Sequence, residues 1–320
     1  MNADALRRAA SGLHPDVLEG LARLPGADLT TVLLELFRRR AAGIDASSVL
    51  RRYVASRFVG PAHIEARTLH RIEGAALSNL PPEVEPVVLA PVVPLGTHGI
   101  GGIAQTRVLA TVRSSEVAAD PTNGLALEAA VRRRALLLSD PRSAEPVKLA
   151  ASQRVLRAQR FDEGASAHFQ IFGRVTAGRD CGDDSFESDA FVEHVEFLAQ
   201  VAVTLNPRAS VFVEFTDLTG GDMWKLRTAL DDALGEANRA TLRDRPDRPG
   251  GRNYYERACF KVFATIDGGE PMELADGGSV GWTRDLLQNQ KERLVISGLG
   301  LERLALLLDG ATLDEGDEIP

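Results

Sequence analysis

The alternation of hydrophobic and polar positions divides the chain into a helical beginning and a longer part in which strands and helices follow one another. In residues 1–58 apolar side chains recur at helical spacing, at positions 18, 21, 24, 32, 33, 36 and 37. Breaks are expected at Leu13-His14-Pro15 and at Leu24-Pro25-Gly26, because proline and glycine end helices. We therefore predict a small N-terminal helical cap over residues 1–58 and a main domain over residues 59–320.

From about residue 61 the pattern changes to short extended runs. Two of them, Val87–Val93 and Arg107–Val112, lie on either side of a glycine-rich segment at residues 96–102. That segment has neither the ending of a P-loop nor a helix directly behind a GxGxxG spacing. It therefore favours a flexible turn over a phosphate-binding loop.

Helical and extended patterns then follow one another in an order that indicates the fold class. A helix is expected from about 121 to 137, since Asp120 followed by Pro121 suits a helix N-terminus. Further along we expect strands at 147–160, 167–177, 210–216, 253–266 and 293–297, a mobile loop at 242–251, and helices at 186–204, 221–241, 282–290 and from about 300. Several strands are not separated by a helix, which predicts an α+β fold with an antiparallel sheet flanked by helices and argues against a Rossmann fold.

The length and the hydrophobic content of the chain are sufficient for a large buried core. Its 320 residues are 44% hydrophobic, without an apolar run of membrane-spanning length. The N-terminal residues show neither a secretory signal nor an anchor, so a cytoplasmic location is expected. Cys181 and Cys259 lie outside any metal-binding spacing and are expected to be reduced thiols.

The net charge of −8 argues against non-specific binding of nucleic acids, which requires a surplus of basic residues. Arginine nevertheless clusters at residues 38–40, 51–52, 132–134 and 243–248. The first three clusters fall inside helical patterns and are interpreted as solvated helix faces.

The strongest local motif is Gly298-Leu299-Gly300-Leu301-Glu302-Arg303-Leu304, between an apolar strand and an apolar helix. It resembles motif 3 of the class II aminoacyl-tRNA synthetases. The resemblance implies that Gly298, Gly300 and Glu302 border ATP and that the arginine, Arg303, contacts adenine and phosphate.

A second segment resembles motif 2 of the same family. Arg157-Ala158-Gln159 ends a predicted strand, a loop follows, and His168 and Phe172 begin the next strand. By this resemblance Arg157 holds the substrate carboxylate and the α-phosphate of ATP, while His168 and Phe172 complete the ATP site. Gln159 replaces the glutamate that is usual in the family, and its amide can still hydrogen-bond adenine.

Further matches are specific to histidyl-tRNA synthetase. The segments Arg252-Asn253-Tyr254-Tyr255 and Ala275-Asp276-Gly277-Gly278 resemble two segments that bind its amino acid, although Ser279 stands where that family has arginine. Asp120 and Thr122 align with a segment whose acidic residue binds the substrate amino group. Pro91 aligns with motif 1, which forms the family's dimer interface. The resemblance thus implies a homodimer, and Asp120, Thr122, Arg252, Tyr254, Gly277 and Gly278 as substrate-binding residues.

Two features separate the chain from histidyl-tRNA synthetase. The Gln and Glu that read imidazole in that family are replaced by Ile171 and Val175 or, in the other register, by Arg174 and Gly178. No anticodon-binding domain is expected after motif 3, where the sequence ends in an acidic tail.

The resemblance therefore implies activation of an amino acid other than histidine, with ATP and Mg²⁺, through an aminoacyl adenylate. Arg157 and Arg303 would be the catalytic residues, and Glu273 or Asp276 could hold magnesium. The acceptor would be tRNA, a protein or a small amine. The alternative is a non-catalytic paralogue similar to the regulatory subunit of ATP phosphoribosyltransferase.

Other polar and aromatic residues give weaker signals. His14, His63, His70, His98 and His194 lack metal-ligand spacing and are expected to be structural. Glu214 and Asp217 could line a pocket, although helix capping by Thr219 or Asp222 is the simpler interpretation. Trp224 and Trp282 are expected in the core or at an interface.

Overall fold

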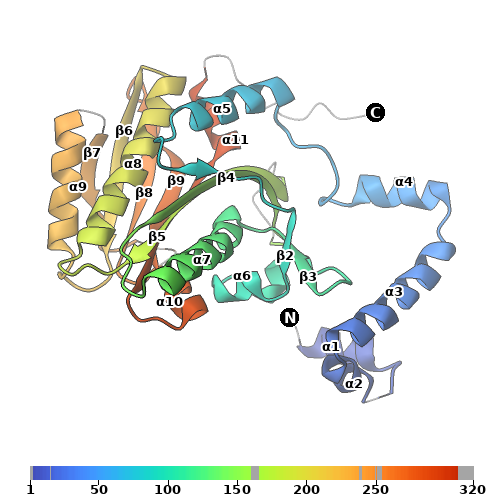
Figure 1. The fold of residues 1–320 in the computed structure, drawn as a ribbon. Helices are drawn as coiled ribbons and strands as arrows, with labels where there is room; N and C mark the ends of the chain where they lie inside the picture. The colour runs from blue at the N-terminus through green and yellow to red at the C-terminus, as the bar shows by residue number, and fades with distance from the viewer. Residues whose placement is uncertain are drawn as a thin grey trace.

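The protein is built on one large, mostly antiparallel sheet (Figure 1). The computed structural model describes residues 3–14, 16–159, 166–237, 240–248, 250 and 254–308. Within them the strand order is β1-β4-β5-β10-β9-β8-β6-β7, and only the outer pairs β1/β4 and β6/β7 are parallel. The strands are β1 (Glu85–Pro86), β4 (Val147–Leu156), β5 (His168–Arg179), β6 (Ala209–Asp217), β7 (Ala240–Asp244), β8 (Ala258–Ile266), β9 (Met272–Val280) and β10 (Glu292–Gly300). The predicted α+β architecture is confirmed.

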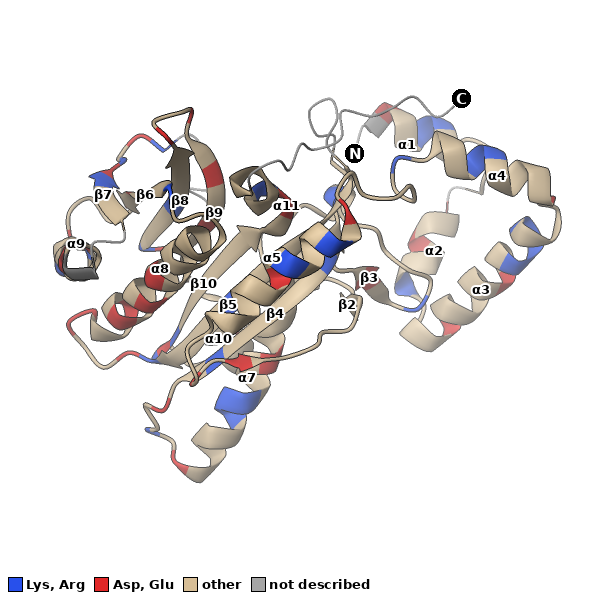
Figure 2. Ribbon diagram, turned by 90° about the horizontal axis from the view of Figure 1, so that it is seen from above, with Lys and Arg blue, Asp and Glu red and all other residues tan. Residues whose placement is uncertain are grey.

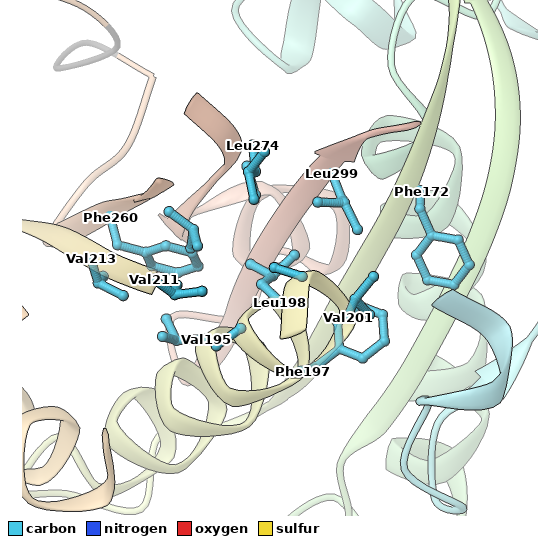
Figure 3. Close-up of a cluster of buried hydrophobic side chains, with 14 of the residues drawn as sticks. Phe172, Val195, Phe197, Leu198, Val201, Val211, Val213, Phe260, Leu274 and Leu299 are labelled. Carbon is cyan, nitrogen blue, oxygen red and sulfur yellow. The ribbon is translucent and has the colours of Figure 1, made fainter. Parts of the chain in front are cut away.

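Helices cover both faces of this sheet. On one face α8 (Ser185–Leu205) and α5 (Ala66–Ser78) pack with the short α11 (Leu301–Leu304), and their apolar side chains form the main core. Figure 3 shows Phe172, Leu198 and Val201 within this cluster. On the other face α7 (Pro121–Ser139) and α10 (Trp282–Leu287) cover part of β4, β5 and β10 and leave the rest of that face open.

The outer elements complete the body. Helix α9 (Trp224–Ala237) packs on α8 and β7, and β2 (Val92–Pro94) pairs with β3 (Ser115–Val117) in a separate two-stranded sheet. Trp282 is buried as expected, whereas Trp224 is 62% exposed at the start of α9. Among the described residues, no helix combines the length and hydropathy that crossing a bilayer requires.

The N-terminal region is helical, as its periodicity predicts. It comprises α1 (Ala3–Ala10), α2 (Val17–Arg23), α3 (Gly26–Ala42) and α4 (Ala46–Ala55). These helices lie beside the sheet, and Figure 2 shows the basic residues of α3 and α4 on them. Helices α2, α3 and α4 contain no buried residue. A break that was not predicted separates α3 from α4. There the Asp45 side chain caps α4 by accepting from the Ser48 amide at 2.9 Å.

The structure corrects several local predictions. Residues 66–78 form helix α5 instead of extended chain, because Ile72 and Ala76, four positions apart, pack on the core. Residues 107–112 form no strand beyond an isolated bridge at Ala110. The expected mobile loop begins with strand β7, whose parallel pairing with β6 depends on a tertiary contact. Strand β9, which contains two adjacent glycines, was not anticipated.

Arg133 is not part of a solvated helix face. It is fully buried and forms an ion pair with the equally buried Glu292 at 2.9 Å. The guanidinium also donates to the carbonyls of Ser143 and Glu145. The arginines at positions 38–40 and 51–52 are exposed, as expected. The predicted solvated helix face at residues 132–134 is therefore wrong for Arg133.

Candidate functional site

A cavity of about 620 Å³ opens on the part of the sheet that α7 leaves uncovered. It lies over the ends of β4, β5, β9 and β10 and beside the N-terminus of α7. It brings together most of the residues singled out from the sequence: Asp120, Thr122, Arg157, Gln159, His168, Tyr254, Glu273, Asp276, Gly298, Gly300, Glu302 and Arg303. Arg252 lies outside the described residues.

Asp120 and Arg157 form an ion pair at one side of the cavity. Arg157 Nη2 lies 3.0 Å from Asp120 Oδ2, and its Nε donates to the Ala119 carbonyl at 2.8 Å. The other oxygen of Asp120 caps α7 by accepting from the amide and hydroxyl of Thr122 at 2.9 and 2.7 Å. The carboxylate is therefore fixed by a helix N-terminus, which favours negative charge. The pair presents a fixed acid and a fixed guanidinium to a ligand.

The glycine-rich segment forms a buried support for this pair instead of a flexible turn. It contains helix α6 (Thr97–Ile100), and Glu116 accepts from the amides of Gly96 and His98. His98 is fully buried, and its Nε2 accepts from the Ala119 amide at 3.0 Å. Its Nδ1 therefore carries the proton and donates to Asn123 Oδ1 at 2.7 Å. This structural histidine holds the chain on both sides of Asp120.

The opposite side of the cavity contains a second set of paired charges. Tyr255 O–H donates to Asp276 Oδ1 at 2.8 Å, and Arg248 Nη2 donates to Asp276 Oδ2 at 2.5 Å. Burial raises the pKa of Asp276, although the Arg248 cation opposes the shift. Burial also raises the pKa of Tyr254 and of Tyr255 well above the ordinary tyrosine value. Both tyrosines therefore stay protonated at neutral pH.

The residues similar to motif 3 occupy the end of β10 and the start of α11. Glu302 accepts from the Gln170 amide through both carboxylate oxygens at 2.9 Å and from Arg154 at 3.2 Å. Arg303 is 57% exposed, and its Nη1 lies 3.1 Å from Glu273 Oε1. The other carboxylate oxygen of Glu273, Oε2, lies 2.5 Å from Lys261 Nζ. These cations lower the pKa of Glu273 despite the opposing effect of burial.

His168 is held by both ring nitrogens. Its Nε2 donates to the Gly60 carbonyl at 2.6 Å, so its Nδ1 accepts from Arg154 at 2.7 Å. Arg57 donates to the carbonyls of Ala158 and Gln159. The segment that follows the N-terminal helices is thereby bound to the start of β5 and to the residues that follow β4.

Three predicted site residues do not line the cavity. Phe172 is buried in the main core with its ring centroid 5.7 Å from that of Phe197. Successive strand residues face opposite sides, so the cavity receives Phe169, whose ring lies 5.3 Å from the Arg157 guanidinium carbon. Gly277 and Gly278 instead allow close packing of Phe260 and Tyr255 against β9.

The same alternation places the two residue pairs that the sequence left open on opposite faces of β5. Ile171 lines the cavity and Val175 lies in the core on the same face. Arg174 faces the other side, where it is buried and donates to the Glu193 carbonyl at 2.8 Å. Gly178 packs under Phe186. Of these four residues, only Ile171 lines the cavity.

Several lining residues were not found from the sequence. They include His63, Gly102, Ile103, Arg107 and Phe169, and the cavity is also bordered through Asp276 by the buried Arg248. The alternating pattern of β5 could have indicated Phe169. The others come from irregular segments that only the tertiary fold brings to the sheet.

The charged residues around the cavity do not form a preformed metal site. Among the described residues, no cluster of three or more His, Cys, Asp or Glu side chains could hold a metal ion. Glu273 is engaged by Lys261 and Arg303, and Asp276 by Arg248 and Tyr255. The candidate pocket residues Glu214 and Asp217 lie outside the cavity. Asp217 accepts from the amides of Thr219, Gly221 and Met223 ahead of α9, and the Thr219 hydroxyl oxygen accepts from the Asp222 amide, so Asp217 holds most of the turn that was expected to be capped by Thr219 or Asp222.

Comparison with known proteins relates this geometry to solved structures. No family model and no curated protein matches the sequence. The structure of apo histidyl-tRNA synthetase from S. aureus is similar with a TM-score of 0.55 and 12% identity, covering 78% of this chain and 69% of that chain. An ATP phosphoribosyltransferase regulatory subunit/histidyl-tRNA synthetase from Bacillus halodurans C gives 0.55 and 13%, covering 78% and 83%. A histidine–tRNA ligase subunit from Alicyclobacillus acidocaldarius gives 0.51 and 14%, covering 77% and 95%. The chain therefore has the fold of the class II synthetase catalytic domain.

Proposed function

We propose that this protein activates an amino acid other than histidine with ATP, forming an aminoacyl adenylate and pyrophosphate. The observation that carries the proposal is that the Asp120–Arg157 pair and Arg303 border one cavity in a class II synthetase fold. The acceptor of the activated acid would be tRNA, a protein or a small amine.

In this proposal the two members of the Asp120–Arg157 pair have different roles. Asp120 receives the ammonium group of the amino acid, and Arg157 contacts its carboxylate and the α-phosphate of ATP. A carboxylate oxygen then attacks the α-phosphorus, and the bond to pyrophosphate breaks. No protein nucleophile is required, because orientation and guanidinium charge stabilise the transition state.

The remaining ATP contacts are assigned by position. Arg303 and the backbone at Gly298 and Gly300 border the nucleotide, and Phe169 replaces Phe172 as the aromatic residue in the cavity. Mg²⁺ would arrive on the phosphates of ATP, as is usual for this ion. Glu273 is the carboxylate best placed to contact it, because it lies beside Arg303 at the cavity.

Selection of histidine is not supported, because Ile171, which in one register replaces a residue that reads imidazole in histidyl-tRNA synthetase, lines the cavity. An aliphatic side chain cannot hydrogen-bond imidazole.

The second candidate is a non-catalytic regulatory subunit. One observation in its favour is that the charged groups of the cavity already bond to one another. Both ring nitrogens of His168 are bonded to protein groups, and Glu273 and Glu302 form ion pairs with arginines. In addition, one similar structure is described as a regulatory subunit/histidyl-tRNA synthetase. Arg157 and Arg303 would then stabilise the fold or bind a regulatory metabolite.

ATP–pyrophosphate exchange distinguishes the two candidates. The purified protein is assayed with ATP, Mg²⁺ and each amino acid, beside Arg303→Ala and Arg293→Ala variants. We expect exchange that depends on one amino acid and falls by roughly 10²-fold or more in Arg303→Ala, the size typical of a lost transition-state cation. The folded Arg293→Ala variant should retain the activity, because Arg293 lies outside the cavity. Absence of exchange with every amino acid, from folded protein, would favour the regulatory candidate.

A further inference from the structure

Two tyrosines connect the Asp120 side of the cavity with the Asp276 side. Tyr254 and Tyr255 line the same cavity as Asp120 and Asp276. The Tyr254 ring meets the Tyr255 ring edge-on at 5.0 Å, and Tyr255 in turn donates to Asp276. An amino acid whose ammonium group lies at Asp120 therefore has its side chain directed along this aromatic wall toward Asp276.

The floor beneath this path is apolar. Ile171 on β5 and Ile296 on β10 line the cavity, with Gly298 between them. Gly298 is paired with Asp276 on the neighbouring strand, and a Cβ on this glycine would lie 3.5 Å from Ile171. A substrate side chain over this floor loses water without gaining a polar partner, which favours methylene or aromatic groups there.

At the end of the path, the Asp276 carboxylate can accept further hydrogen bonds, and Arg248 balances its charge. Its side chain is 38% exposed to the cavity, whereas its partner Arg248 is only 4% exposed. Arg248 also donates to the carbonyls of Gly250 and Phe260, so all of its nitrogens are engaged. Each carboxylate oxygen accepts one bond from the described residues, and a carboxylate has about four acceptor positions. The free positions suit a donor from a ligand, while Arg248 balances the negative charge.

We propose that the cavity selects an amino acid whose side chain is uncharged, with an apolar stem and a hydrogen-bond donor at its tip that Asp276 accepts. Histidine is set aside because Ile171 lines the cavity, and the class then includes side chains ending in an amide, a hydroxyl or an indole N–H. Lysine, arginine, aspartate and glutamate are excluded because their charge would have no counter-ion. Purely aliphatic amino acids are disfavoured because they leave Asp276 partly unsatisfied. The inference rests on the proposed function only for the placement of the ammonium group at Asp120.

Two measurements on the full chain test the selectivity and keep it separate from catalysis. Exchange is measured with all amino acids, and the shift in melting temperature is measured with each amino acid alone and with ATP. Exchange confined to an uncharged, donor-bearing amino acid supports both proposals. Strongest exchange with a charged or aliphatic amino acid leaves the activity in place and overturns the inference. No exchange, together with a melting shift only from a donor-bearing amino acid, overturns the activity and supports the inference. Neither exchange nor a shift overturns both.

Two charge-altering variants test the role of Asp276 directly. Arg248→Met leaves the Asp276 charge without its partner, and we expect selectivity to move toward lysine or arginine by roughly tenfold or more. Asp276→Asn leaves Arg248 as an unbalanced cation and should move selectivity toward aspartate or glutamate. Arg245→Met, at an exposed arginine of the same segment, is the control and should change nothing. If Arg248→Met does not fold, Asp276→Asn still decides the question. Unchanged selectivity in a folded Asp276→Asn variant overturns the inference.

Discussion

At the scale of single residues, burial separates chemistry from structure. Asp120, Arg157 and Arg303 are partly exposed to the cavity and available to a ligand. His98, Arg133 and His194 are fully buried and serve the fold. The sequence gives little sign of this difference, because an arginine in a helical pattern has the same spacing whether its face meets water or a buried glutamate.

The buried ion pair of Arg133 and Glu292 predicts a large effect of one substitution. Arg133→Met should destabilise the protein by about 3–5 kcal/mol, because Glu292 would remain charged and buried without a partner. Arg134→Met, at the exposed neighbouring position, should change stability by less than about 0.5 kcal/mol. Urea unfolding of both variants measures this. Equal, small effects would show that Glu292 finds another partner or water.

His194 predicts how stability depends on pH. It is fully buried, and burial together with the Arg174 cation lowers its pKa well below the ordinary value. The unfolded chain therefore binds a proton below about pH 6.5 that the folded chain does not bind. The stability that neutral His194 permits is present above that pH and is lost as pH falls.

A His194→Gln variant tests this origin, because an amide can still bond Thr176 and Ser297 and does not titrate. We expect the decline in unfolding free energy between pH 7 and 5.5 to become shallower by up to about 1.4 kcal/mol per pH unit. Urea titrations at three pH values would measure it. An unchanged slope would assign the acid sensitivity to other groups.

At the scale of elements, glycines determine how closely β9 approaches its neighbours. A Cβ at Gly278 would lie 2.6 Å from both the Ala258 carbonyl oxygen and the Tyr255 ring, neither of which can move freely. Gly235 in α9 has no atom within 4 Å of the corresponding position. The family resemblance implies that the two adjacent glycines in β9, Gly277 and Gly278, bind substrate, whereas the structure shows them in close packing of a central strand.

We predict opposite effects of alanine substitution at Gly278 and at Gly235. Gly278→Ala should destabilise the protein by about 1–3 kcal/mol through overpacking. Gly235→Ala should stabilise it by up to about 1 kcal/mol, because alanine has the higher helix propensity. Thermal unfolding of the two variants decides the matter, and a tolerated Gly278→Ala would show that Tyr255 can shift away from β9.

At the scale of the whole molecule, exposed apolar residues surround the segment that resembles motif 1. Val88 is fully exposed, and Val92 and Leu95 are 39% and 52% exposed. We predict that this segment around Pro91 forms the interface of a homodimer, because large apolar surface is usually covered by a partner. Light scattering should give twice the mass of one chain, and Val88→Asp should lower it. A single-chain mass at all concentrations would contradict the prediction.

The sequence by itself determined the fold class, most of the helices and strands, and most of the predicted site residues that meet in the cavity. Periodicity reports which face of an element is buried, and the glycines and arginines of the family motifs keep their spacing. Only the tertiary structure decided which face of β5 carries the site, so that Phe169 and Ile171 line it while Phe172 does not. It also decided that Arg248 and Arg133 are buried, and that β7 pairs with β6. The physical reason is that these outcomes depend on contacts between segments far apart in the chain, which local pattern does not record.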